Sequence, residues 1–137
     1  MWFLDSGCSR HMTGDQHQFQ ELTLKEKGFV NYGDNNKGKI LGVGNVGHSS
    51  TLLIENVLYV DGLKYNLLSI SQLTDKGFDI NFNSETCQIV DKHSNINLTG
   101  HRINNMYMLS LQSIHDKNVC LTSVSNESWI WHKRIAH

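Results

Sequence analysis

The residues best suited to chemistry stand at the start of the chain. An apolar run, residues 2–4, leads directly into Asp5, Ser6 and Gly7. A short apolar run that ends in an acid and a glycine predicts a buried strand followed by a tight turn. The turn would present a carboxylate that can activate water, beside a hydroxyl that can hydrogen-bond to a neighbour. A plain strand-end turn without chemistry is the alternative, because such tripeptides are common in ordinary turns.

Activation of water by carboxylates, as in aspartic proteases, needs two acids that share one proton, because like charges a few ångström apart cannot both ionise. The chain contains one Asp-Ser-Gly, and no other aspartate stands between an apolar strand and Ser/Thr-Gly. The second carboxylate must then come from an identical chain. A twofold symmetric dimer would place Asp5 opposite its own copy, with water rather than Ser6 or Cys8 as the nucleophile.

A cysteine nucleophile is a weaker hypothesis. Cys8 and His11 are three residues apart, so contact is possible. A catalytic pair also needs a stabilised thiolate and a third group that orients the histidine, and the sequence suggests neither. We expect His11 to be a turn residue with satisfied hydrogen bonds.

The glycine-rich stretch Gly42-x-Gly44-x-x-Gly47 formally matches a dinucleotide-binding fingerprint. That motif requires a helix after the glycines, whereas a β-type sequence follows here, so we reject a phosphate site. The pattern instead predicts a β-hairpin with a mobile tip at residues 42–47. Such a tip could open and close over a substrate groove.

Metal binding is not expected. The chain has eight histidines and three cysteines, but most of the histidines stand singly in predicted turns: His17, His48, His93, His101 and His115. His132 and His137 could form half of a zinc site, but the Cys-x-x-Cys half is absent from the sequence. Since a structural zinc site needs four ligands, we expect no cofactor, and zinc only if that missing half were present.

Composition limits the class of protein. The 137 residues carry a net charge of −1, which gives no field for strong nucleic-acid or membrane binding. Proline is absent, so glycine, asparagine and aspartate must form the turns, as in a β-rich domain. The odd number of widely spaced cysteines indicates reduced thiols. We therefore expect an intracellular, cytoplasmic protein without a membrane span.

Hydrophobic patterning predicts seven to nine short strands and one or two short helices. The strand candidates include residues 78–82, a hairpin of residues 86–90 and 95–99, and a last strand at 106–111, whereas apolar spacing favours a helix over 67–73. We expect an all-β fold, a small closed barrel over residues 1–111. Residues 112–128 are predicted to be a linker, and 129–137 the truncated start of a further region.

Four segments, in the right order, resemble the Ty1/copia-type retrotransposon Gag-Pol polyproteins. Trp2-Phe3-Leu4-Asp5-Ser6-Gly7-Cys8-Ser9-Arg10-His11-Met12-Thr13-Gly14 resembles the start of their protease. Ile40-Leu41-Gly42-Val43-Gly44 looks like the flap, and residues 56–60 with 63–73 resemble the segment that ends the protease core. Residues 131–137, Trp-His-Lys-Arg-Ile-Ala-His, are similar to the opening of the pre-integrase zinc region.

The resemblance implies a homodimeric, retropepsin-like aspartic endopeptidase that cleaves the element's own polyprotein, within a virus-like particle in the full element. Asp5 would be the catalytic acid, and Ser6 and Gly7 would complete its loop. The flap would comprise Ile40, Leu41, Gly42, Val43, Gly44 and Gly47.

Two alternatives stay open. One is a catalytically inactive, truncated β-barrel remnant that acts as a folded interaction module. The other is a nucleic-acid-associated module, suggested by the terminal histidine pair and opposed by the near-neutral charge.

Overall fold

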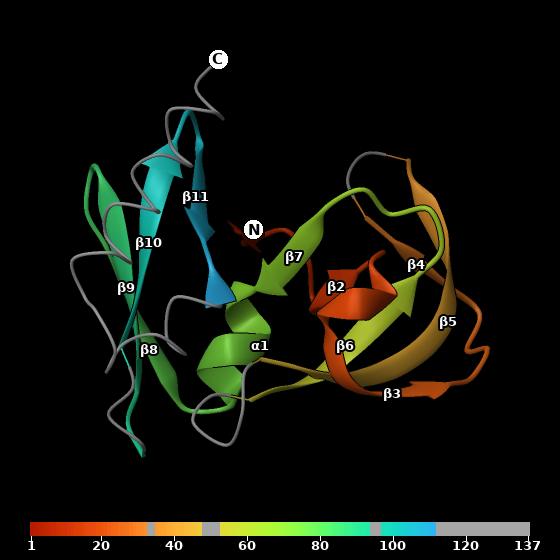
Figure 1. Ribbon diagram of the computed structural model, residues 1–137. Coiled ribbons are helices and arrows are strands. Elements are labelled where there is room, and N and C mark those ends of the chain that lie inside the picture. The colour runs from red at the N-terminus through yellow and green to blue at the C-terminus, as the bar shows by residue number, and fades with distance from the viewer. Residues whose placement is uncertain (33–34, 48–52, 94–96, 112–137) are drawn as a thin grey trace.

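Strands dominate the computed structural model, which describes residues 1–32, 35–47, 53–93 and 97–111 (Figure 1). The first half contains β1 (Trp2–Asp5), β2 (Met12–Thr13), the 3₁₀ turn η1 (Gln16–Gln18), β3 (Phe19–Leu24), β4 (Phe29–Asn31), β5 (Lys37–Val46) and β6 (Ile54–Val60). The second half contains β7 (Asn66–Ser69), α1 (Ile70–Asp75), β8 (Phe78–Phe82), β9 (Thr86–Asp91), β10 (Asn97–Ile103) and β11 (Met106–Leu109). In these ranges no helix has the length and apolar character needed to cross a membrane.

The strands form one continuous mixed sheet, in the order β3-β5-β6-β2-β7-β1-β11-β10-β9-β8, with β4 also paired to β5. This path has two ends, β3 and β8, and no pairing among the described strands joins them. The β-rich class is confirmed, but the closed barrel predicted from the sequence is not what these strands form. The antiparallel meander β8–β11 extends the sheet beyond β1 instead of closing it.

The centre of the sheet is β1, which is hydrogen-bonded along both edges. It runs parallel to β7 and antiparallel to β11. The other edge of β7 pairs with β2, so β7 lies between two strands that are consecutive in the sequence. The connection from β1 to β2, residues 6–11, therefore passes across the end of β7.

The central strands pack against apolar clusters on both faces. Trp2 and Leu4 of β1, with Leu68 of β7, belong to one apolar cluster, whereas Leu67 of β7 belongs to a second cluster against which Phe3 packs. Neighbouring residues of a strand point to opposite faces, so each central strand contributes to two cores. Double burial gives the end of β1 little freedom to move.

One short helix is present, but it begins later than the sequence predicted. Residues 67–69 of the predicted helix 67–73 belong to β7, and α1 starts at Ile70. Leu67 and Leu68 are both buried because they face different cores, and adjacent leucines cannot distinguish a doubly buried strand from a helix. Ser69 ends the strand and caps the helix, its Oγ accepting the Gln72 N–H at 3.2 Å.

The glycine-rich stretch also differs from the expectation. Residues 40–46 lie inside β5, paired to β3 on one side and β6 on the other. A Cβ atom on Gly44 would lie 2.0 Å from the Glu21 carbonyl oxygen, so this glycine allows β3 to approach closely. The strand continues to Val46, and residues 48–52 are outside the described ranges.

This close approach predicts a large cost for Gly44→Ala. Because the opposing atom is backbone, we expect the free energy of unfolding to fall by about 3 kcal/mol or more. Gly28→Ala is the control, since Gly28 has open space around it and only its φ of +89° opposes a side chain; we expect about 1–2 kcal/mol there. Urea unfolding of both variants measures the difference, and equal losses would contradict a tightly packed β5.

Candidate functional site

Asp5 is the last residue of β1 and stands at the corner of an exposed loop. Its Oδ1 accepts the backbone N–H of Gly7 at 2.7 Å, while Ser6 and Gly7 are exposed. A Cβ atom on Gly7 would lie 3.2 Å from the same Oδ1, which is tighter than most such contacts. The loop's own backbone therefore orients the carboxylate at a surface that another molecule can reach.

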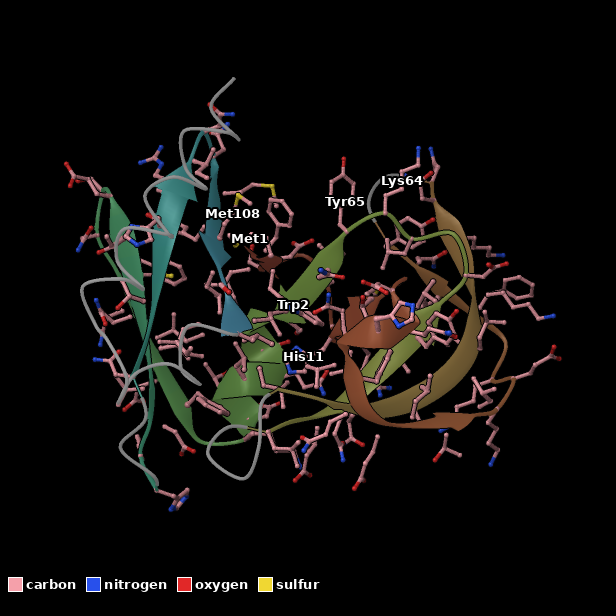
Figure 2. All side chains as sticks on the ribbon, in the orientation of Figure 1. Met1, Trp2, His11, Lys64, Tyr65 and Met108 are labelled. Atoms are coloured by element: carbon pink, nitrogen blue, oxygen red, sulfur yellow. The ribbon has the colours of Figure 1, made fainter. Side chains whose placement is uncertain are left out.

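The surroundings of Asp5 are set by β7. Asp5 is the Cα partner of Ser69 in the parallel pairing, and by strand alternation its side chain shares a face with Phe3. The Phe3 ring contacts the edge of the Tyr65 ring, with centroids 5.7 Å apart, and Figure 2 shows Tyr65 pointing outward from the segment that leads into β7. Asp5 thus lies on a rigid strand beside a partly exposed aromatic pair.

Cys8 is buried in the core behind the loop, and its Sγ lies 3.8 Å from the Asp5 carbonyl oxygen. Burial, and then the negative charge of Asp5, raise the pKa of the Cys8 thiol to about 11. The thiol is therefore protonated near neutral pH, and a protonated thiol is a poor nucleophile.

His11 is a core residue, 1% exposed, at the far end of the same loop (Figure 2). Its Nδ1 accepts the backbone N–H of Ser69 at 2.9 Å. Burial, with a smaller effect from the charge of Arg10, lowers the pKa of His11 to about 4. The predicted satisfied hydrogen bonds are confirmed, but the burial was not foreseen. His11 is therefore not available as the base that would take a proton from Cys8, because its Nδ1 already accepts the Ser69 N–H.

The predicted flap residues are not neighbours of Asp5 in the sheet. The stretch Ile40-Leu41-Gly42-Val43-Gly44 belongs to β5, which β6, β2 and β7 separate from β1; Gly47 follows this strand at a φ of +131°. Closure of this region on a substrate stays a prediction. His132 and His137 are outside the described residues, as are the predicted linker and zinc region.

A cavity of about 230 Å³ was not foreseen from the sequence. It lies where α1 meets the start of β6, the start of β8 and the turn after β9, and it is lined by His11, Leu53, Ile54, Glu55, Leu73, Lys76, Phe78, Asp91 and His93. These residues come from four separate parts of the sequence, so no local pattern could reveal it. Among the described residues, no group of three or more potential ligands is arranged to hold a metal ion.

The class defined by these features is a β-rich domain whose central strand carries an acidic loop. The sequence matches the family described as "Pol polyprotein, beta-barrel domain" over residues 2–78. More than half of the chain is covered, so the chain belongs to this family and is a domain of a retroelement Pol polyprotein. No curated protein matches the chain. The match ends at the first residue of β8, so the meander that completes the pairing of β1 lies beyond it.

The raised pKa of Cys8 predicts a slow thiol. At neutral pH we expect iodoacetamide to alkylate Cys8 in the folded protein far more slowly than a free cysteine, because burial and Asp5 disfavour the thiolate. Mass spectrometry of quenched samples gives the rate at each site, with urea-unfolded protein as the control. Alkylation of folded Cys8 at the unfolded rate would contradict the assignment.

The lowered pKa of His11 predicts that the protein loses stability in mild acid. An unfolded histidine takes up a proton near pH 6.5, but the folded one only near pH 4, so the unfolded state binds more protons between these values. The free energy of unfolding should fall by about 3 kcal/mol as the pH drops through this window. Urea titrations of wild type and His11→Asn measure it, and the same slope in both would exclude His11 as the cause.

Proposed function

We propose that this domain is an aspartic endopeptidase of a copia-type Gag-Pol polyprotein, active as a homodimer. The membership in the Pol polyprotein family supplies the setting. The specific activity rests on one observation, a half-buried Asp5 carboxylate that the Gly7 N–H orients at the end of the central strand, next to the exposed Ser6 and Gly7.

The fold supports the proposal by assembling the segments that carry the sequence resemblance. Residues 2–14 supply β1 and β2, residues 56–60 belong to β6, and residues 63–73 supply β7 and α1. These strands are hydrogen-bonded neighbours, in the order β6-β2-β7-β1. Segments about fifty residues apart in sequence thus form one platform with Asp5 at its corner.

The proposed chemistry uses Asp5 from each of two chains. One carboxyl is protonated and donates a hydrogen bond to the carbonyl oxygen of the scissile peptide, while the other takes a proton from a water molecule held between them. That water attacks the carbonyl carbon and forms a tetrahedral diol, as the first carboxyl gives its proton to the carbonyl oxygen. The C–N bond then breaks: the leaving amine takes the proton that the second carboxyl removed from water, and the first carboxyl regains a proton from the diol. In this proposal the Ser6 hydroxyl, which is exposed, hydrogen-bonds across the twofold axis of the dimer.

The partners of the proposed enzyme follow from this chemistry. They are a second copy of the chain, which completes the acid pair, and an extended peptide of the polyprotein as substrate. The proposed location is the cytoplasm, within a virus-like particle of the full element. Neither a membrane nor a nucleic acid has a role in this reaction.

A non-enzymatic interaction module is the second candidate. The observation in its favour is the open sheet, whose end strands β3 and β8 leave a row of backbone groups unpaired among the described strands. Sedimentation at high protein concentration separates the two candidates, because a strictly monomeric chain leaves Asp5 without a second carboxylate.

The enzymatic proposal predicts that Asp5→Asn abolishes cleavage of a polyprotein-derived peptide while leaving the fold intact. An amide oxygen can still accept the Gly7 N–H, but an amide cannot exchange the catalytic proton. Asp75→Asn, at an exposed position at the end of α1, is the matched control and should cleave at the wild-type rate. Cleavage that survives in Asp5→Asn, or that resists pepstatin-type inhibitors, would overturn the mechanism.

A further inference from the structure

His11 connects the Asp5 loop to three other parts of the fold. Its ring nitrogen Nδ1 accepts the N–H of Ser69, and its backbone N–H donates to Gln72 Oε1, both at 2.9 Å. Its carbonyl oxygen accepts the N–H of Leu58, also at 2.9 Å. The residue that ends the loop is therefore bound to β7, α1 and β6.

Ser69 is where both ends of the loop meet. It pairs with Asp5 through the β1–β7 ladder and donates its N–H to His11. On its other edge β7 pairs with β2 only at Asn66 and Leu67, so the His11 ring satisfies a backbone donor that β2 does not reach. The loop is closed across the end of β7, with Asp5 at one end and the imidazole at the other.

Gln72 extends this connection to β6. Its side-chain amide donates to the carbonyl oxygens of Glu55 at 3.3 Å and Asn56 at 3.1 Å. Arg10 reaches the same Asn56 oxygen from the loop, at 3.5 Å. A movement of the loop would disturb the hydrogen bonds of Arg10, His11 and Gln72 together, so this hydrogen-bond network is cooperative.

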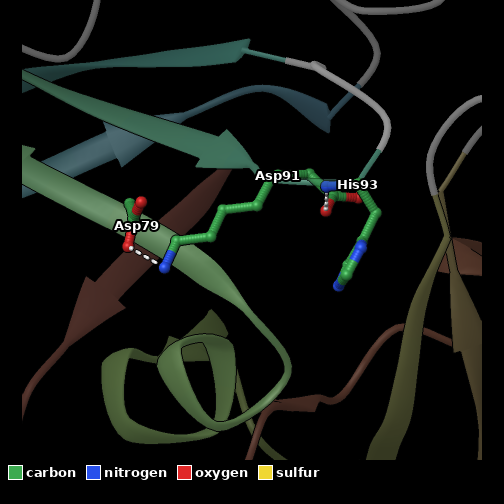
Figure 3. A network of polar contacts seen from close by, with 4 residues as sticks. Asp79, Asp91 and His93 are labelled. Atoms are coloured by element: carbon green, nitrogen blue, oxygen red, sulfur yellow. Dashed lines mark hydrogen bonds and ion pairs between the residues drawn. The ribbon is translucent and has the colours of Figure 1, made fainter.

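The bond between His11 and Ser69 requires a neutral ring. A proton on Nδ1 would turn the acceptor into a donor that faces the N–H of Ser69. The charged or titratable groups around the ring are Arg10 on the loop itself, and Glu55, Lys76, Asp91 and His93, which line the cavity on its other side. Figure 3 shows the His93 ring extending away from Asp91 and from the ion pair of Asp79 with Lys92.

We propose that His11 is the positioning residue of the Asp5 loop, holding it against β7 through the Ser69 N–H for as long as the imidazole is neutral. The consequence for catalysis rests on the proposed endopeptidase function, but the connection between His11 and the loop does not. Acid that protonates the ring would release the loop, and with it the orientation that Gly7 gives to Asp5.

A nuclear magnetic resonance titration tests the connection without any activity. We expect the amide resonances of Ser69 and Gly7 to shift together as the pH falls toward 4 in wild type. In His11→Asn these coupled shifts should be absent, because an amide oxygen can accept the same N–H but does not titrate. Coupled shifts that are unchanged in His11→Asn would overturn the proposal, as would a Gly7 resonance that does not follow Ser69 in wild type.

Cleavage assays test the consequence for Asp5. His11→Leu removes the acceptor and should lower kcat at neutral pH by about tenfold or more, whereas His11→Asn should restore most of this loss and extend activity to lower pH than wild type. If His11→Leu does not fold, the acid side of the pH–rate profile of His11→Asn still tests whether His11 positions the loop. Equal kcat in the two variants, or an acid limb identical to wild type, would show that the role is only structural.

The two arms separate the failure of this inference from the failure of the proposed function. A protein that cleaves nothing, yet shows coupled shifts that depend on His11, would refute the endopeptidase and retain the positioning role. A protein that cleaves normally, with an unchanged pH profile in His11→Asn, would retain the endopeptidase and refute the positioning role of His11.

Discussion

The rest of the structure depends on β1 being held on every side. It is hydrogen-bonded to β7 and β11 along its edges, and its side chains enter apolar cores on both faces. Parallel pairing is stable where both faces are covered; Trp2 and Leu4 are buried on one face of β1, and Phe3 packs against the apolar cluster on the other. An acid at the end of such a strand has a defined position, whereas the same acid on a free loop would not.

Buried polar side chains in the described part of the chain hydrogen-bond to one another and to the backbone. Among the described residues no buried side-chain nitrogen or oxygen lacks a hydrogen-bond partner. Thr13 bonds to Asn66, whose amide reaches the carbonyl oxygen of Met1 at 3.1 Å, and His11 bonds to Ser69. An unpaired buried donor costs about 1–3 kcal/mol, so these bonds fix how β1, β2 and β7 fit together.

Local features could be predicted from the sequence, but long-range ones could not. The acid at the end of a buried strand, the strand at 78–82 and the β9–β10 hairpin all follow from nearby residues. The pairing of β11 with β1 joins residues about a hundred positions apart, and no local pattern encodes it. For the same reason, the sequence predicted a closed barrel that the strands do not form, and it did not predict the cavity beside His11. The glycines of β5 looked like a mobile tip because close approach to β3 and flexibility use the same residue.

The central claim is that Asp5 is half of an acid pair completed by a second chain. The most direct test is to mix wild-type protein with increasing Asp5→Asn protein, under conditions where subunits exchange, and to measure cleavage by a fixed amount of wild type. If each active unit needs two Asp5 residues, the mutant captures wild-type chains in inactive pairs, and the rate falls in proportion to the wild-type fraction. A rate that stays constant at a large excess of Asp5→Asn would contradict the account, because it would mean that one chain acts alone.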